Sequence, residues 1–152
     1  MKRTLSIATI IGALLLGGCA TDGATPSAHV TPESMTGSWQ VVDGHAPGGD
    51  FKPTHDTPIT LTIHEDGTYS GNTGCNDYTG AFSIDGENLS TTPVGATIME
   101  CASDDAEVAD EMAKTEGLYL DALEMVAEGT TEGQQMRLEG EGSHITYQKA
   151  DG

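Results

Sequence analysis

The chain has 152 residues, enough for one domain with a short extension, and it is acidic, with 24 Asp and Glu against six Lys and Arg. A net charge of −18 at pH 7 would repel the phosphate backbone of nucleic acids and the anionic headgroups of lipids. The composition therefore excludes nucleic acid as a partner, and any contact with a membrane must come from a separate anchor.

The first residues have the pattern of a secretory signal peptide. Lys2 and Arg3 form a basic start, residues 5–16 are almost wholly apolar, and Leu-Gly-Gly-Cys follows, ending at Cys19. The apolar run is too short to span a bilayer as a helix, which takes about 20 residues. Leu-Gly-Gly-Cys also resembles the lipobox of bacterial lipoproteins, in which the cysteine receives a diacylglyceryl group and the chain is cut just before it. We therefore predict a signal peptide over residues 1–18 and lipidation of Cys19 (diacylglyceryl and palmitate); the alternative is an ordinary signal peptide that contains this cysteine.

A flexible spacer is predicted after the lipidated cysteine. Residues 20–35 are rich in Ala, Thr, Ser and Pro and show no apolar periodicity. With Cys19 they would form a tether over residues 19–35, whose random-coil reach is about 22 Å. Loss of the two cations of the signal peptide changes the net charge from −18 to −20. The folded domain is predicted over residues 36–150.

Short segments of alternating polarity, separated by turn residues, predict an antiparallel sheet. Residues 37–44 are predicted as a short strand that ends in a turn at Asp-Gly. Apolar and polar residues alternate over residues 59–64, and Asp66-Gly67 is predicted as a two-residue hairpin turn before a strand over residues 68–72.

Two more hairpins are predicted further along the chain. Tyr78, Gly80 and Phe82 lie two residues apart, as on one face of a strand, and Asp-Gly-Glu-Asn at 85–88 turns the chain. The last two strands are predicted to meet at residues 140–142, where Gly-Glu-Gly supplies the turn.

One helix is predicted between the strands. Asp104 is its predicted N-cap, with Glu107 three residues later in a capping box. Gly117 lies inside the helical pattern and could break it. Apolar residues near helical spacing are predicted to face the sheet: Val108, Met112, Tyr119, Leu123 and Val126. The expected fold class is α+β, a mainly antiparallel β-sheet or small open barrel with one helix packed on it.

Cys75 and Cys101 are the two cysteines that remain once Cys19 carries lipid. An exported domain lies in an oxidising compartment, so this even pair predicts a disulfide. A thiol nucleophile is an alternative, but it needs a base, and no histidine lies close in sequence. A zinc site is the other alternative, but it needs two further ligands, and the candidate histidines do not have finger spacing: His45, His55, His64 and His144.

No other pattern of catalytic or cofactor-binding residues is found. The sequence lacks a G-x-S-x-G elbow, an H-E-x-x-H motif, a P-loop and a dinucleotide-binding fingerprint. We therefore predict no catalytic residues, no metal ion and no cofactor, and a protein that is not an enzyme.

Four segments of the chain resemble the META domain, also called the HslJ-like family. They are Gly-Ser-Trp at 37–39, Gly-Cys-Asn-Asp-Tyr-Thr-Gly-Ala-Phe at 74–82, Thr-Ile-Met-Glu-Cys at 97–101, and the final strands with Met-Arg-Leu-Glu-Gly and His-Ile-Thr-Tyr-Gln. The similarity covers about residues 36–149. The order and separation of Gly-Cys-Asn and Thr-x-Met-x-Cys make it fairly specific. The positions that carry the family motif are Gly37, Trp39, Gly74, Asn76, Tyr78, Gly80, Thr97 and Met99.

The resemblance implies a compact, mainly antiparallel β fold with a helix packed on it. Members of the family are often exported bacterial lipoproteins, loosely linked to heat shock and envelope stress, and the resemblance implies no enzymatic activity. We therefore expect a non-catalytic lipoprotein on the extracytoplasmic side of a bacterial membrane that binds an envelope protein. The alternative is a small-ligand-binding module, or an enzyme that uses a pocket in the β fold.

Overall fold

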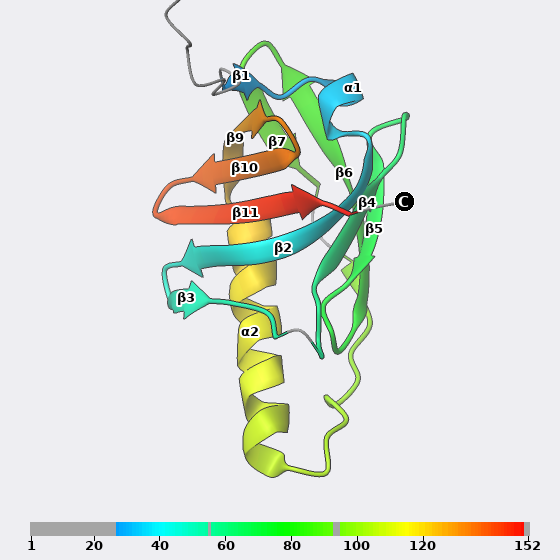
Figure 1. The fold of residues 1–152 in the computed structure, drawn as a ribbon, viewed down its shortest axis with the longest axis vertical. Helices are drawn as coiled ribbons and strands as arrows, with labels where there is room; N and C mark the ends of the chain where they lie inside the picture. The colour runs from blue at the N-terminus through cyan, green and yellow to red at the C-terminus, as the bar shows by residue number, and fades with distance from the viewer. Residues whose placement is uncertain (1–26, 55, 93–94, 151–152) are drawn as a thin grey trace, which may run out of the picture.

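A curved antiparallel sheet with a long helix against it makes up the fold (Figure 1). The structure is a computed structural model, and it describes residues 27–54, 56–92 and 95–150. Its helices are α1 (Pro32–Met35) and α2 (Ala106–Glu124). Its strands are β1 (Ala28–His29), β2 (Gly37–Ala46), β3 (Gly49–Phe51), β4 (Thr60–Ile63), β5 (Thr68–Asn72), β6 (Asp77–Asp85), β7 (Asn88–Thr91), β8 (Gly95–Ala96), β9 (Val126–Glu132), β10 (Gln135–Gly140) and β11 (Ser143–Lys149).

The sheet is open, although it curls strongly. Its strands follow in the order β1-β9-β10-β11-β2-β4-β5-β6-β7, with β3 beside β2 and β8 beside β6. All of the described ladders are antiparallel. The curl brings β7 against β9, but these two strands share no ladder in the described part of the chain. The predicted α+β class, with a mainly antiparallel sheet and one main helix, is confirmed.

Only the C-terminal half of α2 packs into the core. Its buried residues are Leu118, Tyr119, Ala122 and Leu123, and they belong to one buried cluster with apolar side chains of the sheet such as Leu61, Leu138 and Ile145. The N-terminal half of the helix extends past the strands, as Figure 1 shows. The C-terminal half of α2 is therefore part of the core, and the N-terminal half is available for other contacts.

The predicted helix is present as α2, but the predictions of its N-cap, of a break at Gly117 and of the side that Val108 faces were wrong. Its N-cap is Asp105 and not Asp104, because the Asp105 carboxylate accepts from the Glu107 amide at 2.9 Å. The helix continues through Gly117 without a break. Val108 is exposed, which corrects the prediction that it faces the sheet. Val126 is buried as predicted but belongs to β9, and Met112 is only half-buried.

The folded domain begins earlier than predicted. Residues 28–35, which were assigned to the flexible tether, form β1 and α1. The side chain of Thr31 caps α1 in a capping box with Ser34. Val30 and Met35 are buried, so this segment contributes apolar area to the core. The predicted signal peptide and Cys19 lie outside the described residues, within which no helix is long and apolar enough to cross a membrane.

Strand β2 is longer than the predicted strand over residues 37–44. It passes through Asp43 and Gly44 and ends at Ala46, so Asp-Gly is not a turn here. The register against β11 shifts by one residue, with Val42 as the additional residue of a bulge. The bulge lets the strand bend around α2.

The first hairpin turns through three residues and not two. The Gly67 amide donates to the His64 carbonyl at 3.0 Å and the His64 amide donates to the Thr68 carbonyl at 2.8 Å, which leaves Glu65, Asp66 and Gly67 as the loop. Gly67 has a φ of +82°, as expected of the left-handed residue that closes this type of loop. The hydroxyl and amide of Thr68 donate to Asp66, which lowers the pKa of that carboxyl. The prediction of a two-residue turn was wrong because Asp-Gly suits both loops. The turns at 85–88 and 140–142 are confirmed.

Replacing Gly67 with valine should lower the free energy of unfolding by about 1–3 kcal/mol. A β-branched residue resists a positive φ, and its Cβ would lie 3.1 Å from the Phe82 carbonyl oxygen. Urea unfolding followed by the fluorescence of Trp39 measures the change, because this single tryptophan is buried. Gly95→Val is the matched control, since Gly95 is exposed and has no positive φ. Equal urea midpoints for the two variants would contradict the proposed role of this turn.

Candidate functional site

The Gly-Cys-Asn motif forms a tight turn between β5 and β6. The Thr73 amide donates to the Asn76 carbonyl at 2.8 Å, and the Asn76 amide donates to the Thr73 hydroxyl at 2.8 Å. Gly74 has a φ of +88°, a conformation that favours glycine. The turn directs the side chain of Asn76 inward, where only 2% of the residue is exposed.

The side chain of Asn76 binds the Thr-x-Met-x-Cys segment. Its Oδ1 accepts from the Met99 amide and from the Thr97 hydroxyl, both at 2.8 Å. Its Nδ2 donates to the Met99 carbonyl at 3.2 Å. Because one amide side chain satisfies both backbone groups of Met99, it fixes the position of the loop between β8 and α2 much as a neighbouring strand would. The two motif segments, separated in sequence, are therefore one structural unit.

Glu116 of α2 completes this network, and sequence reasoning missed it. Asn76 Nδ2 donates to Glu116 Oε1 at 2.9 Å, and the Thr73 hydroxyl donates to Glu116 Oε2. A buried amide that donates to a carboxylate makes a charge-assisted hydrogen bond, stronger than a bond between neutral groups. Thr73 carried a local signal, since a threonine three residues before Asn76 suits a side-chain-capped turn. Glu116 carried none, because 40 residues separate it from Asn76.

A disulfide between Cys75 and Cys101 ties the same two segments together. Their Cα atoms lie 5.0 Å apart and the sequence separation is 26 residues. Because both sulfurs are used in this bond, neither is a thiolate that could attack a substrate or bind zinc. The predicted pairing is present in the structure, and the nucleophile and zinc alternatives have no free thiol to use.

The four histidines that were candidate zinc ligands do not lie together with the cysteines in the sequence, and the structure shows where three of them are placed. His45 Nδ1 lies 2.7 Å from Asp50 Oδ1, and the His45 ring stacks against His144 with centroids 6.1 Å apart. His64 directly precedes the three-residue loop of the first hairpin, and His55 lies outside the described residues. No group of three or more His, Cys, Asp or Glu side chains is placed to hold a metal ion among the described residues.

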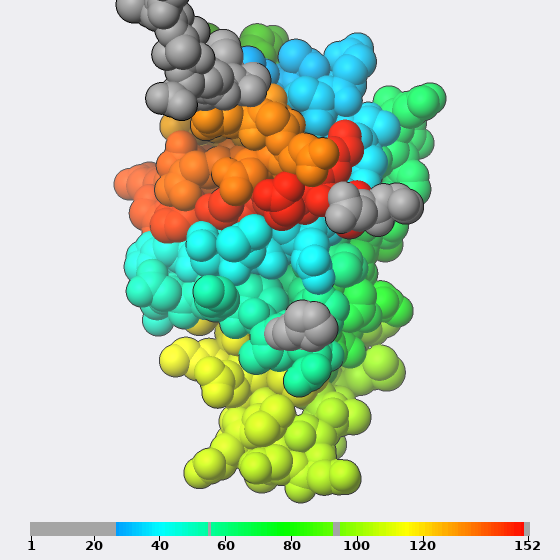
Figure 2. Space-filling view, viewed as in Figure 1, coloured from blue at the N-terminus to red at the C-terminus, as the bar shows by residue number. Residues whose placement is uncertain are grey.

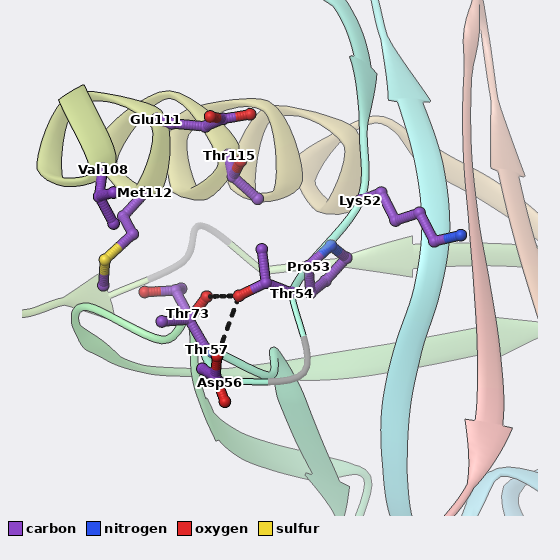
Figure 3. A pocket seen from close by; sticks show the side chains of 10 residues that line it. All are labelled: Lys52, Pro53, Thr54, Asp56, Thr57, Thr73, Val108, Glu111, Met112 and Thr115. Carbon is purple, nitrogen blue, oxygen red and sulfur yellow. Dashed lines mark hydrogen bonds between the residues drawn. The ribbon is translucent and has the colours of Figure 1, made fainter.

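Two hollows flank the Asn76 network at the N-terminal half of α2. One, of about 310 Å³, lies between α2 and the segment before β4. In Figure 3, Val108, Met112 and Thr115 point from the helix toward Thr54 and Thr73. The other, of about 340 Å³, lies on the side of the Met99 loop and has these lining residues: Met99, Glu100, Cys101, Ala106, Ala109, Asp110, Ala113 and Glu116.

Apolar side chains are exposed in the loop before α2 and in the first turn of this helix. Ile98 is 99% exposed, Met99 is 61% exposed and Val108 is 46% exposed, and they are three of the four exposed large apolar residues in the described chain. Figure 2 shows this yellow-green end of the molecule, formed by the start of α2 and the preceding loop, standing clear of the strands. We call the exposed residues Ile98, Met99 and Val108, with the two hollows, the apolar end.

Comparison with known proteins identifies the family of the chain. The META domain matches residues 33–152 of the chain. The chain belongs to the META domain family. An NMR structure of a protein from Burkholderia xenovorans is similar, with a TM-score of 0.62 and 22% identity over 90% of this chain and 100% of that one. A second NMR structure has a TM-score of 0.59 and 23% identity over 80% of this chain and 97% of that one. At these identities the likeness concerns the fold alone. No curated protein sequence matches the chain.

Other motif positions of this META domain support the packing of the sheet. Trp39 of β2 donates from Nε1 to the Met35 carbonyl at 2.6 Å, which holds α1 on the sheet, and the Lys149 ammonium lies 5.2 Å from the centre of its ring. Gly37 begins the same strand. Gly80 leaves room for the Tyr69 ring, whose hydroxyl would lie 2.3 Å from a Cβ at that position. These residues stabilise the fold and do not line the apolar end.

The four tyrosines of this META domain are all buried. The Tyr78 hydroxyl donates to the Thr60 carbonyl at 2.7 Å and lies 2.5 Å from the Tyr119 hydroxyl, which lies 3.2 Å from that of Tyr147. Burial raises the pKa of Tyr69 to about 12, with a smaller contribution from the charge of Glu124. Burial raises the pKa of Tyr78, Tyr119 and Tyr147 as well. All four therefore stay neutral at physiological pH and act as core residues.

Proposed function

We propose that this META-domain protein is a lipid-anchored, non-catalytic protein of the bacterial cell envelope that binds another envelope protein through the apolar end. The observation that carries this proposal is the exposure of Ile98, Met99 and Val108 at one end of the molecule. Ile98 and Met99 lie in the loop before α2 and Val108 lies in its first turn, and exposed apolar groups concentrated at one end of a molecule are a feature of interaction surfaces.

The Asn76 network explains why Ile98 is exposed. Asn76 holds Thr97 through its hydroxyl and Met99 through its backbone, so the side chain between them points outward. The disulfide at Cys101 fixes the next turn of the loop. A loop that is already rigid loses little conformational entropy on binding, which favours affinity. The residues of the family motif thus hold the loop in a conformation that exposes Ile98 to a partner, and this role requires no catalytic residue.

The predicted lipid anchor would place the domain next to other envelope proteins. Leu-Gly-Gly-Cys after the apolar run supports lipidation of Cys19. The part of the tether that remains between Cys19 and β1 would hold the domain close to the membrane surface. A weak interaction with a second envelope protein then gains from the restricted volume that the two share.

The alternative function, binding of a small molecule, would use the hollow of about 310 Å³ beneath α2. Its size is at the lower limit of ligand pockets, about 300 Å³, and its threonine hydroxyls could orient a ligand. A small molecule in this hollow would leave Ile98 uncovered, because Ile98 does not line it. We therefore favour a protein, which can cover the hollow and the loop together.

A photo-crosslinking residue placed at position 98 tests the proposed function. In the native envelope, the variant with the crosslinker in place of Ile98 should give a discrete protein adduct after irradiation. The control variant carries the crosslinker in place of Glu141, which is exposed in the β10–β11 turn, and should give none. Adding Val108→Asp to the Ile98 variant should remove the adduct. No adduct at 98, or the same adduct at both positions, would show that the apolar end is not the binding surface.

Replacing Cys19 with alanine should leave the protein either soluble or uncleaved. Without the sulfur there is no site for the diacylglyceryl group, and the lipobox peptidase has no substrate. Fractionation of the envelope, with mass spectrometry of the N-terminus, measures both outcomes. Ala20→Ser serves as the control, since it leaves the cysteine in place and should leave the protein anchored. Recovery of the Cys19→Ala protein in the membrane in its mature form would contradict lipidation.

A further inference from the structure

The acidic residues of the chain are concentrated at the apolar end. Residues 100–116 contain seven of the 24 acids and a single lysine. Four of these acids border the hollows: Glu100, Asp110 and Glu116 line the one beside Met99, and Glu111 lines the one beneath α2. Glu116 is already bonded to Asn76 and Thr73, which leaves Glu100, Asp110 and Glu111 as the framing acids. The apolar surface is therefore framed by negative charge.

These framing carboxylates are available to a partner. Glu100, Asp110 and Glu111 are exposed, and none of them forms an ion pair within the described part of the chain. Lys52 also lines the hollow beneath α2, but Figure 3 shows its ammonium group directed away from it. Lys114 lies one helical turn from Asp110 and Glu111 but forms no ion pair with them in the described part of the chain, and as the single cation among seven acids it leaves this end with a negative charge.

The lining of the hollow beneath α2 suits one kind of side chain. Val108 and Met112 supply apolar contact, while the hydroxyl oxygen of Thr115 can accept a hydrogen bond. The Thr54 hydroxyl is bonded to the hydroxyl and amide of Thr57. Lysine and arginine combine an apolar stem with a head that only donates hydrogen bonds. A basic side chain could therefore place its stem along Val108 and Met112 and its head beside the Thr115 hydroxyl, while the Glu111 carboxylate lies at the rim of the hollow, on the outer side of the helix.

From this complementarity we infer that the occupant of the apolar end is a cationic, amphipathic segment of a partner protein. Its apolar residues cover Ile98, Met99 and Val108, and its lysines or arginines face Glu100, Asp110 and Glu111. This inference rests on the proposed function and adds the chemistry of the partner. The repulsion of anionic surfaces by the rest of the chain leaves a basic segment as the partner that the charge pattern favours.

Binding of designed peptides to residues 20–152, the chain without the predicted signal peptide and the lipidated Cys19, tests the inference. This chain contains every residue that the structure describes. The probe is a 14-residue amphipathic peptide of leucine and lysine, measured by isothermal titration at low ionic strength. Two matched peptides replace every lysine with glutamate or every leucine with serine. We expect the leucine–lysine peptide to bind, the leucine–glutamate peptide not to bind, and the serine–lysine peptide to bind at least tenfold more weakly.

Two sets of variants locate the binding site. Neutralising the three framing acids together, Glu100→Gln, Asp110→Asn and Glu111→Gln, should weaken binding of the leucine–lysine peptide about tenfold, because each exposed ion pair contributes a small amount. The control neutralises three exposed acids elsewhere and should change binding less than twofold: Glu124→Gln, Glu128→Gln and Glu141→Gln.

Apolar contact is tested in the same way. Ile98→Ser and Val108→Ser should each weaken binding at least threefold, whereas Val42→Ser, at an exposed apolar residue of β2, should have no effect.

Equal losses from the two sets of acid variants would mean that the net charge of the chain attracts the peptide, and this would overturn the inference. Equal binding of the leucine–glutamate peptide, or no binding of the leucine–lysine peptide, would overturn it as well. In these cases a crosslinked adduct at position 98 would leave the proposed function intact with a partner of different chemistry. Loss of that adduct would instead contradict the proposed function itself.

Discussion

Replacing Cys75 and Cys101 together with serine should lower the free energy of unfolding by about 3–4 kcal/mol. The bond closes a loop with a sequence separation of 26 residues, and the chain-entropy relation gives about 3.5 kcal/mol for a loop of this length. Most of the effect acts on the unfolded chain. The native fold should therefore persist in the variant, with Trp39 still buried and the near-ultraviolet circular dichroism retained.

Urea unfolding of the oxidised protein, the reduced protein and the double-serine variant measures this effect. Reduction of the native protein should give the same loss as the double substitution, since both remove only the cross-link. Reducing agent should leave the double variant unchanged, which makes it the control for side effects of the reagent. Equal stability of oxidised and reduced protein, or two free thiols in the denatured, non-reduced chain, would contradict the disulfide.

The parts of the fold that rest on local patterns could be predicted from the sequence. Alternating residues placed β4, and Asp-Gly placed the first hairpin, because both signals lie within a few residues of one another. The same signals did not determine the length of the turn, since Asp66-Gly67 suits loops of two or three residues. Likewise, Asp104 and Asp105 can both cap a helix, and the structure uses the second.

The parts that rest on tertiary contacts could not be predicted. Residues 28–35 have the composition of a spacer, yet Val30 and Met35 fit the core once β9 and β2 are in place. The bond between Asn76 and Glu116 joins positions 40 residues apart, and no periodicity connects them. The cysteine pair was predictable despite its separation, because the small number of cysteines left one partner.

The Asn76 network and the disulfide act on the same loop in different ways. The disulfide limits the unfolded chain, whereas Asn76 determines the conformation of residues 97–99 in the folded state. Removal of the disulfide should therefore reduce stability but leave Ile98 presented in the native protein. Removal of the Asn76 hydrogen bonds should affect both stability and the binding surface.

Asn76→Asp should lower the free energy of unfolding by about 3 kcal/mol and reduce crosslinking from position 98. The substitution keeps the size of the side chain but replaces the Nδ2 donor with an oxygen. That oxygen would face the Met99 carbonyl and the Glu116 carboxylate, which now accept from Nδ2 at 3.2 Å and 2.9 Å. Three acceptors without a donor, two of them charged, would then meet at a buried position, and such contacts cost several kcal/mol.

The matched control is Asn88→Asp, at an exposed residue of the β6–β7 turn whose side chain donates to the Asp85 carbonyl at 3.3 Å. Because water can satisfy the groups of this turn, the control should change stability by less than about 0.5 kcal/mol. Urea unfolding gives both values, and the crosslinking yield from position 98 gives the state of the loop. Equal stabilities of the two variants would contradict the buried network. A large loss of stability with an undiminished crosslinking yield in the folded protein would mean that Asn76 stabilises the domain without holding Ile98 in the binding position.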